Sequence, residues 1–220
     1  MKNSDSIRVH DDQAAEYDQQ IRDYRCFAQE ALFGLIFEYV SPHDRLLDIG
    51  IGTGLCSLLF ARVGLDVFGI DGSVEMLKIC KSKGFARDLT QFDLRNMPLP
   101  YSDCFFDHVI SCGVFHFFGD LEPMFKEVFR IIRPGGVFAF TVLAQTPEKE
   151  EKAIHYNPRG YSEIQSDWDA LIFVHSNEYI EKLLRDCGFN NLKEIKFLVW
   201  SGQDDRDDLY CAYVAQRAVI

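Results

Sequence analysis

Residues 47–54 (LDIGIGTG) constrain the fold more than any other part of the sequence. A short apolar run leads into this segment, and a helical pattern containing Leu58, Leu59 and Phe60 follows it. Glycines let the backbone turn sharply and approach a ligand closely, and the first turn of a helix offers free N–H groups. The segment therefore predicts a strand, a tight turn and a helix. On the loop alone, both a binding site and a plain β–α turn remain open.

Strand-like runs alternate with helical patterns along the chain, which is typical of a mostly parallel α/β sheet. An acidic stretch at residues 204–208 separates the last two runs, so we expect them to pair antiparallel. Ser176 is expected to cap the last helix and Gly188 to end it. The expected strands cover residues 45–49, 66–71, 85–89, 106–111, 137–142, 192–200 and 209–216.

At 220 residues the chain is long enough for a domain with its own hydrophobic core. We treat residues 1–220 as one domain, in which residues 1–42 form a helical cap that ends at Ser41 and Pro42. Residues 145–175 exceed the connection that the last helix requires and carry aromatic residues such as Tyr156, Tyr161 and Trp168. Because long loops are often functional, we expect this insertion to form a lid over the strand ends. An inserted helix that only pads the fold is the alternative.

Composition narrows the classes of partner. A net charge of −11 without a basic patch disfavours nucleic acid. No apolar run reaches the roughly 18 residues of a membrane span, and the first residues lack the apolar core of a secretory signal. Seven cysteines without CxxC pairs favour reduced thiols in a cytoplasmic protein and give no zinc-site spacing. We expect a monomer or homodimer that binds a small molecule and no metal.

Asp71 stands at the end of the second expected strand. A carboxylate there can accept hydrogen bonds from both hydroxyls of a ribose. The dinucleotide fingerprint G-x-G-x-x-G requires a glycine where this chain has Leu55, so the loop fits a pyrophosphate poorly. Together, the loop and Asp71 indicate ligand binding much more strongly than either feature alone.

Four motifs then follow one another in a recognisable order. The matching positions are Asp48, Gly50, Gly52 and Gly54 in the first motif, Asp71, Gly72, Ser73 and Met76 in the second, Asp93 and Leu94 in the third, and Arg133, Pro134, Gly135 and Gly136 in the fourth. With them, the chain resembles the class I S-adenosylmethionine-dependent methyltransferases, especially the small-molecule (type 11/12-like) branch, from about Tyr17 to Gly136. Together with the seven expected strands, this implies an α/β, doubly wound, Rossmann-like sheet of order 3-2-1-4-5-7-6, with the seventh strand antiparallel.

The resemblance implies S-adenosylmethionine as the cofactor and S-adenosylhomocysteine as its product. In the family, the loop carrying Gly50, Gly52 and Gly54 passes beside the methionine half of the cofactor, and the acid matched by Asp71 binds the ribose hydroxyls. Asp48 would contact the cofactor, or it would only orient the turn by accepting hydrogen bonds from loop amides.

The adenine side of the expected site follows from the same resemblance. Gly72 and Met76 match residues that lie against the adenine, although Met76 at helical spacing would also suit the core. Asp93 matches the acid that accepts from the adenine amino group, and Leu94 matches the neighbour whose backbone N–H meets the ring. The alternative is that Asp93 is a solvated turn residue that binds nothing.

Three further residues are candidates for contact with the cofactor, two of them at its methionine end. Tyr17 and Tyr24 lie in a segment that resembles the family's helical cap, where a tyrosine reaches this end, and surface packing is their alternative. Cys112 follows the fourth expected strand, where the ligand crevice of such sheets forms. We expect it to line the cofactor as a small residue, because no Pro-Cys motif marks it as a nucleophile.

His116 is the candidate catalytic residue. Methyl transfer from a sulfonium is an in-line displacement that needs alignment, desolvation and, for a protonated acceptor, a base. The small-molecule branch often has a histidine at this place, and an imidazole could take the acceptor's proton. The alternative is a histidine that only packs against Phe115, Phe117 and Phe118.

Three functions therefore compete. The sequence favours a methyltransferase for a small organic acceptor, whose identity it does not reveal. The second is a non-catalytic S-adenosylmethionine-binding module. A nicotinamide-dependent oxidoreductase is the third, and the missing glycine at Leu55 counts against it.

Overall fold

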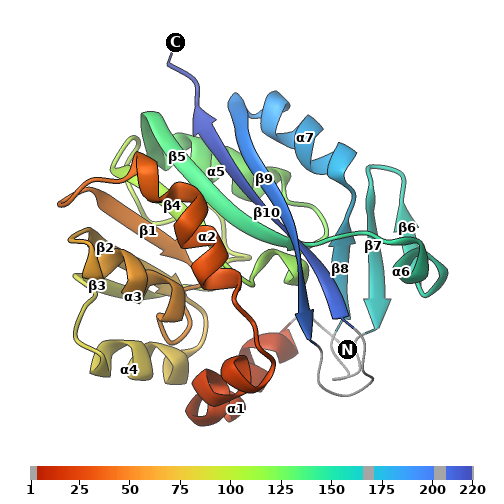
Figure 1. The fold of residues 1–220 in the computed structure, drawn as a ribbon, viewed down its shortest axis with the longest axis horizontal. Helices are drawn as coiled ribbons and strands as arrows, with labels where there is room; N and C mark the ends of the chain where they lie inside the picture. The colour runs from red at the N-terminus through yellow and green to blue at the C-terminus, as the bar shows by residue number, and fades with distance from the viewer. Residues whose placement is uncertain (1–3, 166–170, 201–206, 220) are drawn as a thin grey trace.

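A seven-stranded sheet forms the centre of the computed structural model, which describes residues 4–165, 171–200 and 207–219 (Figure 1). The strand order is β3-β2-β1-β4-β5-β10-β9. The sheet consists of β1 (Arg45–Ile49), β2 (Asp66–Asp71), β3 (Asp88–Gln91), β4 (Phe106–Ser111), β5 (Ile132–Leu143), β9 (Phe189–Trp200) and β10 (Asp207–Arg217). Only β10 runs antiparallel to its neighbours, β5 and β9. The predicted order 3-2-1-4-5-7-6 is confirmed.

Helices cover both faces of this sheet. On one face, α2 (Ala28–Ile36), α3 (Leu55–Arg62) and α4 (Val74–Ser82) bury an apolar cluster with Val67, Ile110 and Val214. On the other face, α5 (Glu122–Ile131) and α7 (Asn177–Asp186) pack on residues that alternate with these along the strands, including Val109 and Tyr213. This alternation is what a sheet buried on both sides requires.

Side-chain caps fix helix starts next to the strand ends. The hydroxyl of Ser176 accepts a hydrogen bond from the backbone N–H of Tyr179 at 3.1 Å and caps α7 as predicted, and Gly188 follows that helix with a φ of 84°. Ser73 caps α4 in the same way through the N–H of Met76. Since a cap satisfies a free N–H of the first turn, these residues define where each helix begins.

Two segments lie outside the central layers. At the N-terminus, α1 (Ser4–Asp23) packs against α4 and precedes α2 and a 3₁₀ turn, η1 (Phe37–Tyr39). The insertion holds a short helix, α6 (Pro147–Glu151), and a separate antiparallel sheet of β6 (His155–Asn157), β7 (Tyr161–Gln165) and β8 (Leu171–His175). The sequence predicted no strands in this segment. Trp168 and residues 204–206 of the acidic turn lie outside the described residues.

No helix within the described ranges is both long and apolar enough to cross a membrane.

Candidate functional site

A pocket opens at the carboxyl ends of β1, β2 and β4, and residues of α1 form one of its walls. Carboxyl ends of parallel strands are where α/β sheets bind their ligands. The predicted site residues that line it are Tyr17, Gly50, Gly52, Asp71, Gly72, Met76, Asp93, Leu94 and Cys112. The predicted residues that do not line it are Tyr24, Asp48, Gly54 and His116. The structure therefore brings together candidates from four different loops.

The glycine loop has the backbone conformation that its sequence indicates. Gly50, Gly52 and Gly54 have φ values of 73°, 53° and 84°, which side chains rarely tolerate. A Cβ at Gly54 would also collide with Phe85, whereas the space beside Gly52 is empty. Gly54 is therefore required by local packing, and Gly52 leaves the pocket open to a ligand.

Asp71 lies at the tip of β2 and faces the glycine loop. One of its carboxylate oxygens accepts from the N–H of Gly52 and the other from the N–H of Ser73, each at 2.8 Å. Burial raises the pKa of Asp71, although these two hydrogen bonds oppose the shift. Each oxygen keeps a second lone pair, so the carboxylate is held in place with capacity for two more donors.

Asp48 lies behind the loop rather than in the pocket. Its side chain is buried, one oxygen accepts from the hydroxyl of Ser57, and the other has no hydrogen-bond partner within the described structure. Burial raises the pKa of Asp48 to about 7. Within the described structure, Asp48 thus neither lines the pocket nor accepts from a loop amide, and it instead binds Ser57 of α3.

The adenine side of the expected site combines apolar and charged groups. Met76 and Leu94 are buried side chains that line the pocket, and Ile7 of α1 packs over Gly72. Asp93 accepts from the guanidinium of Arg95 at 2.7 and 2.5 Å, and this contact lowers the pKa of Asp93. Asp93 is thus an ionised hydrogen-bond acceptor at the pocket wall.

Two carboxylates hold α1 over the pocket. Asp18 accepts from the hydroxyl of Thr53 at 2.5 Å and from the ammonium of Lys83 at 2.7 Å. Asp11 accepts from the hydroxyl of Ser73 and from the N–H of Glu75. The sequence did not predict the contacts of these two carboxylates, because their partners are 35 to 65 residues away along the chain.

Tyr17 and Tyr24 differ in position although they are only seven residues apart in the sequence. Tyr17 lies on α1 and lines the pocket, where burial raises the pKa of its phenol. Tyr24 lies in the turn after α1, and its N–H donates to Gln20 at 2.9 Å. Of the two, Tyr17 therefore has the better position for ligand contact.

His116 lies in a 3₁₀ turn, η2 (Phe115–Phe117), behind the pocket wall. Its ring centroid is 4.1 Å from that of Phe117 and 6.2 Å from that of Tyr210. Burial lowers the pKa of His116 to about 3, and its Nδ1 has no hydrogen-bond partner in the described part of the chain. The wall itself is formed by Phe117 and Phe118, which the sequence analysis treated only as packing neighbours.

Within the described residues, no group of three or more His, Cys, Asp or Glu side chains could hold a metal ion. The insertion does not line this pocket either, as far as the described residues show. The lid expected of residues 145–175 therefore stays a prediction.

Comparisons with known proteins connect this geometry to one family. A family model described as a methyltransferase domain matches residues 47–140. A malonyl-[acyl-carrier protein] O-methyltransferase from Serratia marcescens is 34% identical over 103 residues, which cover 47% of this chain and 40% of that enzyme. The chain spans less than two thirds of the length of this and other curated relatives.

Solved structures show the same fold. An S-adenosylmethionine-dependent methyltransferase from Methanosarcina mazei has a TM-score of 0.71 at 20% identity, covering 84% of this chain and 98% of its own. A 1,6-didemethyltoxoflavin-N1-methyltransferase from Burkholderia thailandensis, solved with S-adenosylhomocysteine, has a TM-score of 0.69 at 14% identity, covering 98% of this chain and 89% of its own. With its sheet order, the chain therefore has the fold of S-adenosylmethionine-dependent methyltransferases, and its residues 47–140 match the type 11 methyltransferase domain.

Proposed function

We propose that this protein transfers a methyl group from S-adenosylmethionine to a small organic acceptor and produces S-adenosylhomocysteine. The observation that carries the proposal is the Asp71 carboxylate, which two backbone N–H groups hold beside an open glycine loop. A carboxylate at the tip of the second strand suits the paired hydroxyls of a ribose. The methyltransferase domain that residues 47–140 match supports the same ligand.

The pocket residues fit the other parts of that cofactor. Met76 and Leu94 supply apolar surface for an adenine, and the ionised Asp93 can accept from its amino group. Gly52 leaves room beside the loop for the methionine portion, and Tyr17 covers this end from α1. S-adenosylmethionine supplies a methyl group on a positively charged sulfur, and no metal is needed for its transfer.

In this proposal the chain contributes alignment and exclusion of water. The ion-paired α1, Tyr17 and the aromatic wall of Phe117 and Phe118 enclose the pocket, so an acceptor would meet the methyl group out of bulk solvent. His116 would stay neutral behind this wall, so we propose that it supports the ring of Phe117 next to the acceptor rather than taking up the acceptor's proton. The low pKa of His116 favours an acceptor whose nucleophilic atom carries a free lone pair, or one that loses its proton only after methyl transfer has begun.

The acceptor is proposed only as a class. Relatives named for malonyl-[acyl-carrier protein], phosphoethanolamine and demethylmenaquinone differ widely, so none of these substrates is transferred to this chain. The aromatic wall favours an organic acceptor with apolar surface over a nucleic acid, which would require a basic patch. We also propose a cytoplasmic, single-domain monomer or homodimer, with residues 1–42 as cap and residues 145–175 as lid.

Calorimetry and a labelled-methyl screen test the function. Binding of S-adenosylmethionine and S-adenosylhomocysteine but not NAD would separate the proposal from a nicotinamide-dependent oxidoreductase. Transfer of labelled methyl to any acceptor in a metabolite panel would separate it from a binding module, since a binding module would bind both ligands and methylate nothing.

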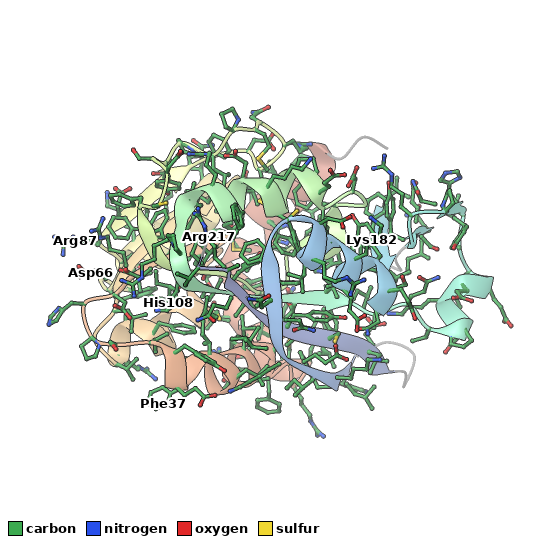
Figure 2. The ribbon with its side chains drawn as sticks, turned by 90° about the horizontal axis from the view of Figure 1, so that it is seen from above. Phe37, Asp66, Arg87, His108, Lys182 and Arg217 are labelled. Atoms are coloured by element: carbon green, nitrogen blue, oxygen red, sulfur yellow. The ribbon has the colours of Figure 1, made fainter. Side chains whose placement is uncertain are left out.

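The matched pair Asp71→Ala and Asp66→Ala tests the site itself. Loss of the Asp71 hydrogen bonds should cost about 2–4 kcal/mol, which weakens S-adenosylhomocysteine binding by about 30- to 700-fold. Asp66 lies at the opposite end of β2 and pairs with Arg87 on the surface at 3.0 Å (Figure 2), so its variant should bind like wild type. A folded Asp71→Ala protein that binds within about threefold of wild type would refute the ribose role.

A further inference from the structure

A second cavity, of about 830 Å³, lies between the insertion and the face of β10 that packs against α7. We call it the insertion cleft and define it by Gln145, Arg159, Ser162, His175, Lys182 and Lys196, which are among its lining residues. Its volume lies within the range of about 300–1,000 Å³ that is usual for small-molecule sites. None of its described lining residues lines the cofactor pocket.

The inner wall of the insertion cleft carries buried polar atoms that lack partners. Ser162 is 1% exposed and His175 is 2% exposed. Ser162 Oγ, His175 Nδ1 and Gln145 Oε1 have no hydrogen-bond partner within the described structure. Because roughly 90% or more of buried polar groups in proteins are hydrogen-bonded, three such atoms around one cavity point to a bound molecule that satisfies them.

The hydrogen bonds of the neighbouring atoms show what these groups would accept. His175 Nε2 lies 3.0 Å from the carbonyl oxygen of Phe118 and 3.1 Å from that of Gly119, so it must carry the ring's proton. Burial lowers the pKa of His175 to about 4, and its Nδ1 is then a free acceptor. The amide of Gln145 donates to Glu150 at 2.9 Å, which leaves its Oε1 as a second free acceptor. The inner wall therefore suits a ligand with a hydrogen-bond donor.

Among the described residues, the outer part of the insertion cleft carries three basic side chains and two acidic ones. Lys182 of α7 and Arg159 of the β6–β7 turn have side chains that are 69% and 60% exposed, and they pair with Asp186 and Asp120. Lys196 of β9 is exposed and forms no ion pair with any described residue. Figure 2 shows Lys182 at the side of the molecule opposite Asp66 and Arg87. Glu150 and Glu178 also line the cleft, so Lys196, for which no ion pair is formed within the described residues, is the basic group most available to an anion.

Aromatic side chains also line the insertion cleft. Tyr156 of β6, which is 59% exposed, and Tyr179 of α7 both line the cavity. A planar organic body could pack between such side chains while its ends reach the lysines and the inner wall.

We propose that the insertion cleft binds a small aromatic anion, with its carboxylate at Lys182 and Lys196 and a hydroxyl or amino donor at His175 and Gln145. This site is separate from the cofactor pocket and does not depend on methyl transfer. His175 nevertheless joins the two regions, because the carbonyl that it binds belongs to Phe118 of the cofactor pocket wall.

The test uses 6-hydroxy-2-naphthoate as the probe, measured by calorimetry on protein saturated with S-adenosylhomocysteine. We expect one molecule to bind per chain. 2-Naphthoate, which lacks the donor, should bind about three- to tenfold more weakly, and 2-naphthol, which lacks the carboxylate, about tenfold more weakly. Lys196→Glu should weaken 6-hydroxy-2-naphthoate binding about tenfold or more. Lys126→Glu is the matched control, because Lys126 is an exposed lysine of α5 outside the cleft, and it should change nothing.

Three results would overturn the proposal: no binding of 6-hydroxy-2-naphthoate, equal binding of 2-naphthol, or unchanged binding in Lys196→Glu. If S-adenosylhomocysteine does not bind, the proposed function fails on that measurement. The naphthoate titrations are then run without it, and they decide the insertion cleft on their own.

Discussion

The cofactor pocket and the insertion differ in how their polar atoms are satisfied. Around the pocket, Asp71, Asp18 and Asp93 all have hydrogen-bond or ion-pair partners within the protein. Around the insertion, Gln145, Ser162 and His175 each keep an atom without a partner in the described structure. The three carboxylates at the pocket are thus oriented before a ligand arrives, although Asp48 Oδ1 and His116 Nδ1 behind it lack partners in the part of the chain described. The unpartnered atoms of the insertion cleft, in contrast, belong to its lining residues.

This difference indicates two modes of recognition. A carboxylate that backbone N–H groups already orient binds a ribose without rearrangement, and such preorganisation favours a ligand shared by a whole family. Unpartnered groups on a separate small sheet cost free energy until a ligand satisfies them, and they can differ from one relative to the next. We therefore expect cofactor affinity to depend on the pocket and binding in the insertion cleft to depend on the insertion, while acceptor selection by the insertion follows from the lid proposed above.

Removing the insertion should produce the largest effect. We expect replacement of residues 146–169 by a short glycine linker to lower turnover of the acceptor found in the labelled-methyl screen by about 100-fold or more. Affinity for S-adenosylhomocysteine should stay within about threefold of wild type, because none of the described insertion residues lines the cofactor pocket. Single-turnover assays and calorimetry on the same preparation measure both quantities.

Retained cofactor binding also shows that the shortened protein is folded. Unchanged turnover on the same acceptor would show that specificity lies elsewhere and would contradict the lid. Loss of both turnover and S-adenosylhomocysteine binding would contradict the division into two regions, because the insertion would then be needed for the cofactor site.

A smaller effect is expected where α1 meets the pocket. Asp18→Ala removes the hydrogen bond to Thr53 and the ion pair with Lys83. The side chains of Asp18 and Lys83 are only partly exposed. We expect affinity for S-adenosylhomocysteine to fall about three- to tenfold, mainly through faster dissociation. Asp23→Ala, at the end of the same helix, removes an equal charge whose described partner is only Gln19. Stopped-flow dissociation should separate the two variants, and equal rates would show that α1 does not close the pocket.

The sequence predicted the cofactor half better than the insertion, for physical reasons. Gly50, Gly52 and Asp71 are close in sequence and follow strands, so their positions depend on local backbone preference and on strand order. Asp11 and Asp18 lie seven residues apart on one face of α1, but nothing local indicates that this face packs against α4. Tertiary packing decides such contacts.

The insertion was harder to predict because its strands are short. β6 has three residues, and β7 has five. Runs of that length carry little periodic signal. One contact of their sheet is the backbone bridge between His175 of β8 and Ala144, which follows β5. No sequence pattern predicts this bridge. His116 shows the same limit on a smaller scale, because one 3₁₀ turn after β4 decides whether its ring enters the pocket.

The last prediction is that His116 adds no measurable pH dependence to turnover near neutral pH. An ordinary histidine takes up a proton near pH 6.5, but burial lowers the pKa of His116 to about 3, so its ring stays neutral above about pH 4. A sulfonium bound nearby would disfavour the charged ring further. We therefore expect the single-turnover rate to change less than about twofold between pH 5.5 and 8 through this residue, in wild type as in His116→Gln. A limb near pH 6.5 that disappears in His116→Gln would show that the acceptor opens the ring to water, and the neutral role assigned to His116 would then be wrong.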